Sequence, residues 1–357
     1  MKKFLLSVLF LSSLCFATAQ DIHFSQFYAS PLTLNPALTG VMNCNTRVTA
    51  NYRSQWASVL NTNAFRTYSV SYDQKIPVGR SDYFGIGGLF WSDVAGQTDF
   101  GTVTGKLSLS YSKKMGGYGK TAHYLVVGAN GGVSRRGADF LNATWGIQYD
   151  GRSGADTNID PQENFNNNNF LFADMAAGLL WFSVLDDNSN FYVGAAMSHL
   201  NRANQSFNDD EFEALYTRFT GHAGGQFLIG RSLGLNPGIV VFSQGPSFQT
   251  NLGTNLRFLL GNYRRSNQAV QFGVWYRMAN AYDGSGAANA EREEQLFASD
   301  ALILTGRFDY ESFSIGFSYD INVSDLAVAS NGNGAFEFSL IYMFCGPEAR
   351  STYCPRF

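Results

Sequence analysis

Residues 336–344 read Phe-Glu-Phe-Ser-Leu-Ile-Tyr-Met-Phe, and their alternation decides the fold class. Large apolar side chains stand at every even position, whereas Glu337 and Ser339 fall between them. Successive side chains of a β-strand point to opposite faces, so this segment has one face that is apolar throughout. The segment therefore predicts a β-strand with one face in a polar environment and the other in an apolar one.

The same alternation recurs along the chain, in residues 312–321 and 102–112. Period two alone fits either a soluble sandwich or a membrane barrel, in which the apolar face meets lipid and the polar face meets the lumen. The composition favours the barrel: 31 Phe and 18 Tyr accompany only 15% charged residues. Beyond the N-terminus, the sequence contains no run of about 20 apolar residues that would predict a transmembrane helix.

This reading predicts an all-β transmembrane barrel of about 14 antiparallel strands, an even number as bacterial single-chain barrels have. The predicted strands are Thr46 to Trp56, Phe65 to Lys75, Tyr83 to Val94, Asp99 to Lys114, Thr121 to Arg135, Leu171 to Val184, Asn190 to His199, Tyr216 to Ile229, Leu235 to Gln244, Ser247 to Leu260, Gln268 to Met278, Ala298 to Asp309, Ser312 to Ile321 and Ala335 to Phe344.

The connections between these strands alternate in length, as expected if short turns are periplasmic and long loops are external. We predict external loops at Arg136 to Phe170, Leu200 to Leu215, Ala279 to Phe297 and Asn322 to Gly334. Short periplasmic turns are predicted at Leu185 to Ser189, Gly230 to Gly234 and Tyr310 to Glu311.

The N-terminus has the form of a secretory signal peptide. Lys2 and Lys3 precede an apolar stretch that ends in Ala17-Thr18-Ala19, which predicts cleavage near Ala19/Gln20 and a cell outer membrane location. We therefore divide the chain into a signal peptide (1–19), an N-terminal periplasmic or plug segment (20–45), the barrel (46–344) and a C-terminal periplasmic tail (345–357).

Three cysteines remain after cleavage, in a compartment where disulfides persist. Cys345 and Cys354 are close in sequence, and we predict that they pair and leave Cys44 single. The alternative is that all three are unpaired.

Charged residues of several strands fall at inward positions, where buried charges are tolerated only in pairs. The arrangement favours a salt-bridged interior that closes the barrel over an ion-selective pore. The predicted lumen network consists of Arg47, Arg53, Lys106, Asp73, Arg218, Arg257, Arg277, Arg307, Asp309, Asp320 and Glu337.

No motif predicts an enzyme, a cofactor or a metal site. Gly119-Lys120-Thr121 lacks the first glycine of a phosphate-binding loop, and the four histidines lack metal-ligand spacing. Asp156, Asp160 and Glu163 do not follow the order of a calcium loop, which favours a solvated loop. A net charge of -3 gives no reason to expect nucleic acid, and no small-molecule substrate is expected.

Several segments together resemble the PorP/SprF family of the Bacteroidota type IX secretion system. The resemblance covers essentially the whole mature chain and is carried by Asp21 to Gly40, Arg47 to Trp56, Phe191 to Gly194, Ser198 to Phe207, Thr220 to Gly225 and Cys354 to Phe357. It implies an outer-membrane protein of type IX secretion and gliding that supports export or surface attachment of large adhesins. The resemblance leaves open whether the protein is a member of the core secretion machine or a paralogue dedicated to an individual adhesin.

Two functional hypotheses follow. In the first, the barrel holds a secreted adhesin or a periplasmic component of the type IX machine, with outer-membrane lipid around it. Partner contact is then expected in residues 346–357 and in the N-terminal segment, through Phe24, Phe27, Tyr28, Pro31, Asn35 and Pro36. In the second, Asn35-Pro36-Ala37 is similar to hydrophobic-compound transporters of about fourteen strands, and the N-terminal segment plugs an outer-membrane transport channel.

Overall fold

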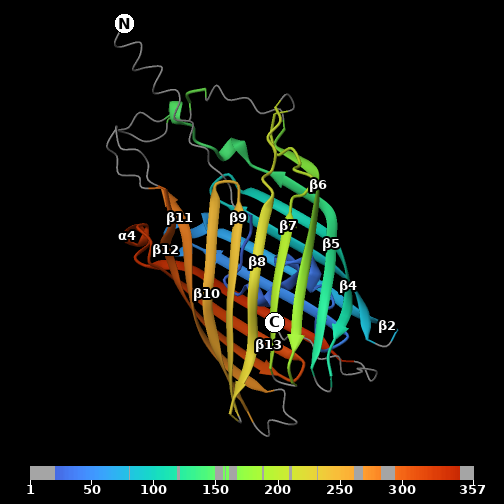
Figure 1. Cartoon of the computed structure of the whole chain (residues 1–357). Coiled ribbons are helices and arrows are strands. Elements are labelled where there is room, and N and C mark those ends of the chain that lie inside the picture. Colours follow the sequence, from blue (N-terminus) through green and yellow to red (C-terminus); the bar gives the residue numbers. More distant parts are fainter. Residues whose placement is uncertain are drawn as a thin grey trace.

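The computed structural model is a closed barrel of fourteen antiparallel strands in sequential order (Figure 1). It describes residues 21–79, 81–118, 121–148, 156, 158–160, 167–186, 189–208, 211–230, 232–260, 268–282 and 294–345. The barrel closes where the first strand pairs with the last, with Thr46 opposite Phe344 and Arg53 opposite Glu337. Closure leaves no unpaired sheet edge, as a β-structure in lipid requires.

All of the predicted strands are confirmed, with ends that move by at most four residues. They are β1 (Thr46–Gln55), β2 (Phe65–Val78), β3 (Asp82–Ala95), β4 (Phe100–Gly116), β5 (Ala122–Gly137), β6 (Asn169–Val184), β7 (Asn190–Ser198), β8 (Arg218–Ile229), β9 (Leu233–Gln244), β10 (Ser247–Leu259), β11 (Ala269–Tyr282), β12 (Glu294–Tyr310), β13 (Phe313–Asn322) and β14 (Asn333–Phe344). The largest shifts extend β11 and β12, because backbone pairing between these strands continues as far as Tyr282 opposite Glu294.

The two faces of the wall follow the predicted alternation. On β13, Phe313, Ile315 and Phe317 point outward and are 45–48% exposed, whereas Ser318 and Asp320 are buried inside. An apolar outer surface lowers the free energy of the barrel in lipid, and the polar inner surface needs partners within the lumen. The exterior is therefore that of a membrane β-barrel.

Connections of different lengths distinguish the two ends of the barrel. The short-turn end carries the connections 79–81, 117–121, 185–189, 230–232, 260–268 and 311–312, and the long-loop end carries 56–64, 96–99, 138–168, 199–217, 245–246, 283–293 and 323–332.

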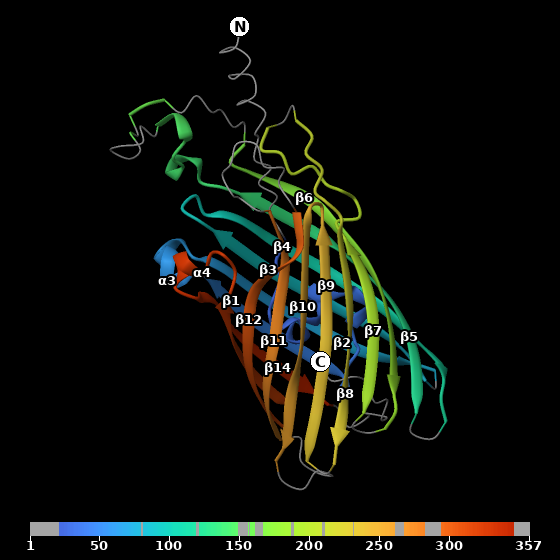
Figure 2. The same cartoon turned by 60° about the vertical axis from the view of Figure 1, so that its left-hand side comes forward.

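The described parts of the long-loop connections contain short helices. They are α3 (Ala57–Leu60), η3 (Asn61–Asn63), η4 (Phe140–Asn142), η5 (Gly146–Gln148) and α4 (Ala327–Ser330). Helices α3 and α4 lie against each other beside β1 (Figure 2). Among the described residues, no helix has both the length and the apolar character needed to cross a membrane.

The N-terminal segment folds inside the barrel, where it appears in blue behind the strands (Figures 1 and 2). We call residues 21–45 the plug. It contains η1 (Phe27–Ala29), α2 (Pro31–Leu34) and η2 (Pro36–Leu38). Both Pro31 and Pro36 open a helical turn, where a missing N–H costs nothing, and Asn35 accepts a hydrogen bond from the backbone N–H of Ala37 at 2.8 Å.

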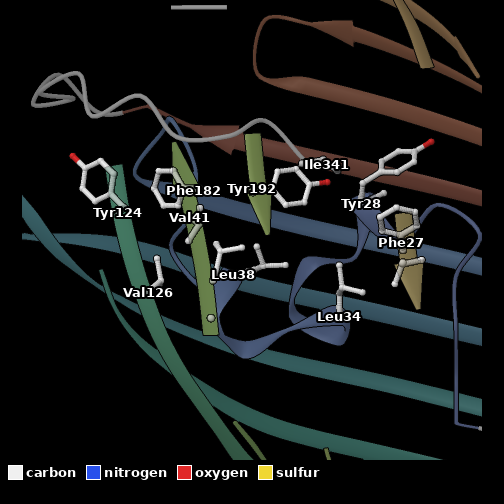
Figure 3. Packing of buried hydrophobic residues seen from close by; sticks show 14 of the residues in the cluster. Phe27, Tyr28, Leu34, Leu38, Val41, Tyr124, Val126, Phe182, Tyr192 and Ile341 are labelled. Atoms are coloured by element: carbon white, nitrogen blue, oxygen red, sulfur yellow. The ribbon is translucent and has the colours of Figure 1, made fainter. Parts of the chain in front are cut away.

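The hydrophobic core lies between the plug and the inner wall (Figure 3). Phe27, Leu34 and Leu38 of the plug pack with Phe182 of β6 and Trp275 of β11, and all five are nearly inaccessible to solvent. The strand pattern alone suggested an interior that is polar throughout. The structure shows that the interior also contains apolar residues. Inward apolar residues occur where the plug covers them.

Candidate functional site: a plug bound along the barrel lumen

The plug runs from one end of the barrel to the other. At the long-loop end, the backbone N–H of Asp21 donates to Gln244 Oε1 at 3.0 Å, directly before the turn at 245–246. At the short-turn end, Cys44 lies beside the start of β1 and the end of β14. The chain therefore enters β1 only after it has crossed the whole lumen.

Ion pairs hold the first residue of the plug. Asp21 Oδ2 lies 3.1 Å from Arg218 and 3.1 Å from Nε2 of His199, whose Nδ1 lies 3.0 Å from Asp174. Lys106 pairs with the same Asp174 at 2.6 Å. We call these five residues the latch.

The latch changes the protonation equilibria of its two groups that lie outside the strands. Burial by itself lowers the pKa of His199, but the carboxylates of Asp21 and Asp174 outweigh it and raise the pKa to about 9. Burial raises the pKa of Asp21, yet the His199 and Arg218 cations hold it well below its usual range. At neutral pH, Asp21 and His199 are therefore both ionised, and each charge lies beside a charge of opposite sign.

A second polar cluster binds the plug at Ser25 and Gln26. Both backbone N–H groups donate to the carboxylate of Glu337, at 2.5 and 2.9 Å, and the Ser25 hydroxyl donates to Asp320 at 2.8 Å. Arg53 pairs with Glu337 and, at 3.2 Å, with Asp320. Arg277 completes the cluster through Asp320 at 2.7 Å and through Asp300.

Glycines of the wall let the middle of the plug approach closely. The Asn35 amide donates to the carbonyls of Leu179 and Ala195 at 3.0 and 3.2 Å. A Cβ on Gly178 would lie 1.9 Å from Asn35 Oδ1, and one on Gly128 would lie 2.5 Å from the backbone of Ala37. Any larger residue at these two positions would displace the plug.

The last part of the plug is bound to β1, β2 and β4. Asp73 accepts from the Gly40 backbone at 2.8 Å and pairs with Arg47 at 2.8 Å. Arg47 also donates to the Leu38 carbonyl at 3.0 Å, and Ser110 donates to the Thr39 carbonyl at 2.6 Å. Backbone groups of Leu38, Thr39 and Gly40 thus find hydrogen-bond partners in the wall.

A disulfide joins Cys44 at the base of the plug to Cys345 after β14, with Cα atoms 4.3 Å apart. The predicted pairing of Cys345 with Cys354 is therefore wrong, and Cys44 is not single. The physical reason is barrel closure: Thr46 pairs with Phe344, which places the residues that flank these two strands together across 301 positions of sequence. Cys354 itself lies outside the described residues.

The structure places all residues of the predicted lumen network inside the barrel. Arg47 pairs with Asp73, Arg53 with Glu337 and Asp320, Arg277 with Asp320, and Arg257 and Arg307 with Asp309. Three members of the network have partners outside the predicted set, since Lys106 pairs with Asp174, Arg218 with Asp21, and Arg277 with Asp300 as well as with Asp320.

The six residues predicted for partner contact are buried in the lumen, and their role in partner contact stays a prediction. Phe24, Phe27, Tyr28, Pro31, Asn35 and Pro36 all pack inside the barrel. The sequence alone did not show that the barrel wall supplies contact partners along this N-terminal segment. Two features of the sequence could have indicated a filled lumen. They are the glycines at inward-facing strand positions, such as Gly128 and Gly178, and the inward-facing Asp174.

Two cavities flank the plug. One of about 570 Å³ lies at the short-turn end, between the plug and β7–β14, and one of about 400 Å³ lies at the long-loop end beside Asp21. Within the described ranges, no three His, Cys, Asp or Glu side chains are grouped so as to hold a metal ion. The arrangement is suited to fixing a segment of chain in place.

The family model described as type IX secretion system membrane protein PorP/SprF matches residues 17–342. This chain belongs to the PorP/SprF family. It is therefore a type IX secretion system membrane protein, and the predicted resemblance is confirmed. No curated protein matches this family member in sequence.

Solved structures are similar to this PorP/SprF protein at low identity. The CymD monoaromatic hydrocarbon channel is 11% identical with a TM-score of 0.46, covering 89% of this chain and 93% of CymD. The Pseudomonas putida toluene transporter TodX is 10% identical with a TM-score of 0.42, covering 88% and 92%. CdiB from Acinetobacter baumannii is 11% identical with a TM-score of 0.42, covering 84% and 60%.

Proposed function

We propose that this PorP/SprF-family protein is a non-enzymatic outer-membrane scaffold of type IX secretion and gliding. In this role it supports export or surface anchoring of a large adhesin, or it holds periplasmic secretion components at the membrane. Cleavage of the signal peptide near Ala19/Gln20 would deliver it to the outer membrane, with the long-loop end outside. The short-turn end, with residues 345–357, would then face the periplasmic machine.

The observation that carries the proposal is the attachment of the plug along its whole length. Removal of the plug would separate Asp21 from Arg218, Ser25 from Glu337, and Gly40 from Asp73, and the base is bonded covalently through Cys44. A buried polar group left without its partner costs about 1–3 kcal/mol. A barrel filled in this way is a rigid body that is better suited to holding partners than to passing solutes.

A deletion strain tests the proposal. We expect loss of surface display of one large adhesin, measured by antibody labelling of intact cells, with restoration by the wild-type gene. Loss of all type IX export would identify a member of the core machine, whereas loss of one adhesin would identify a dedicated paralogue. Unchanged display of every type IX substrate would refute the scaffold role.

A transport channel is the second candidate, and the two cavities beside the plug favour it. A small or hydrophobic compound could occupy the spaces of about 570 and 400 Å³ if the plug shifted between them. Reconstitution into planar bilayers separates the two functions. A sealed bilayer supports the scaffold, and single-channel conductance that depends on this protein supports transport.

A further inference from the structure

Polar side chains form one inward-facing row across six neighbouring strands near the long-loop end of the barrel. From β14 through β1 to β5, residues that lie opposite each other in the strand pairing are Glu337, Arg53, Thr67, Asp93, Thr102 and Arg136. All of them except Glu337 line the cavity of about 400 Å³ beside the start of the plug. The row is therefore a polar band along one side of this cavity.

Asp93, within the row, has no counter-charge among the described residues. Its Oδ1 accepts a hydrogen bond from the Thr67 hydroxyl at 2.5 Å, and no described cation lies within ion-pair distance of its carboxylate. Arg53, two strands away, is already paired with Glu337 and, at 3.2 Å, with Asp320. A partly buried carboxylate with one neutral donor favours a cation in the adjoining cavity.

Arg136, at the end of the row, is likewise without a carboxylate partner in the described part of the chain. Its Nε donates to Thr102 at 3.1 Å and its Nη1 donates to Gln205 at 2.6 Å, and both acceptors are uncharged. Its Cζ lies 5.8 and 5.7 Å from the ring centroids of Phe100 and Phe172. Because Nη2 forms no hydrogen bond with a described residue, the guanidinium can still bind a carboxylate.

The barrel wall holds these two opposite charges apart. Strand β4 lies between the strands of Asp93 and Arg136, and two strand spacings amount to about 10 Å. Within the described residues, the two side chains do not pair with each other. Phe65, Trp91 and Phe100 line the same cavity and give it an aromatic surface beside the charged row. The cavity thus offers a separated anion, a separated cation and an apolar surface.

We propose that this cavity binds a zwitterionic α-amino acid with an aromatic side chain. The α-carboxylate of the ligand accepts a hydrogen bond from Arg136, its α-ammonium group donates to Asp93, and its ring packs on the aromatic surface. Each of the two protein charges then gains the partner that it lacks. The volume of about 400 Å³ lies in the range of small-molecule sites. A neutral hydrocarbon would leave both charges unpaired, so the site discriminates against it.

Isothermal titration calorimetry of the purified protein in detergent micelles tests the site with three probes. L-Phenylalanine carries both charges, 3-phenylpropanoate lacks the ammonium group, and 2-phenylethylamine lacks the carboxylate. We expect saturable binding of L-phenylalanine, and binding of the other two that is weaker by about tenfold or more, because each leaves one protein charge unpaired. The proposal is overturned if L-phenylalanine does not bind, or if either singly charged probe binds as tightly.

Two variants test which residue recognises which charge. Asp93→Asn, which keeps an acceptor for Thr67, should lower the affinity for L-phenylalanine about tenfold or more and leave that for 3-phenylpropanoate unchanged. Arg136→Gln should lower the affinity for L-phenylalanine similarly and leave that for 2-phenylethylamine unchanged. Arg135→Gln is the matched control, because Arg135 is exposed on the outer face of the same strand and should retain wild-type affinity.

The crossed pattern of these affinities separates charge recognition from a loss of folding. A uniform loss of affinity for every probe, in a variant that keeps the wild-type Tm, would contradict the assigned roles. An equal loss in Arg135→Gln would do the same. The site does not depend on the scaffold role, which adhesin display tests separately.

Discussion

Replacing Gly178 by alanine tests whether the shape of the barrel wall holds the plug. A Cβ at this position would lie 1.9 Å from Oδ1 and 2.9 Å from Cγ of Asn35, and 3.2 Å from Cδ of Pro36. These atoms belong to the helical turn of the plug that is bound to β6 and β7. The plug must therefore move away from the wall in the variant.

The expected loss of stability comes from two sources. Displacement of Asn35 breaks its hydrogen bonds to the Leu179 and Ala195 carbonyls, at 3.0 and 3.2 Å, and each contributes about 1 kcal/mol. Crowding in a packed interior costs a further 1–3 kcal/mol, roughly. We therefore expect Gly178→Ala to lower the free energy of unfolding by about 3–5 kcal/mol.

Urea unfolding of the purified barrel in detergent micelles, followed by tryptophan fluorescence, measures this loss. Gly131→Ala on β5 is the matched control, because a Cβ there meets only Met175 Cγ, at 4.0 Å, and we expect almost no change. Adding Asn35→Ala to Gly178→Ala removes the clashing side chain. The two changes together are then expected to cost less than the sum of their separate effects by at least about 1 kcal/mol.

Two results would refute this reasoning. The first is a Gly178→Ala barrel that unfolds at the same urea concentration as the Gly131→Ala control. The second is strict additivity of Gly178→Ala and Asn35→Ala, which would mean that the methyl group and the Asn35 side chain do not meet.

Three further predictions concern the attachments of the plug. His199→Gln removes a stabilisation of the folded barrel that is complete below pH 6.5 and is lost as the pH rises through about 9. The difference in Tm between variant and wild type should therefore vanish across that interval. A difference that stays constant with pH would contradict the ionised latch. Glu337→Gln breaks a buried ion pair and should cost about 3–5 kcal/mol in urea unfolding, whereas Lys113→Gln, which breaks an exposed pair, should have no measurable effect. Cys44→Ser should lower stability by about 2–4 kcal/mol, and reduced wild type should match it; identical unfolding of oxidised and reduced wild type would count against a stabilising disulfide.

The strands could be predicted from the sequence because a barrel wall imposes a period of two that is readable locally. The alternation of Phe336 and Phe338 with Glu337 and Ser339 can be read without knowledge of the rest of the chain. The same alternation on other strands correctly predicted that Arg47, Asp73 and Asp320 face the lumen. Lipid on one side and polar partners on the other are constraints that each strand meets by itself.

Contacts between distant parts of the chain could not be predicted in this way. The pairing of Cys44 with Cys345, of Asp21 with Arg218, and of Ser25 with Glu337 depends on barrel closure and on the path of the plug through the lumen. The N-terminal segment lacks a regular period, because its shape is set by the wall that surrounds it. Sequence by itself thus determined the barrel and its two faces, and only the tertiary structure decided what fills the lumen, since that choice depends on groups that become neighbours after the barrel has closed.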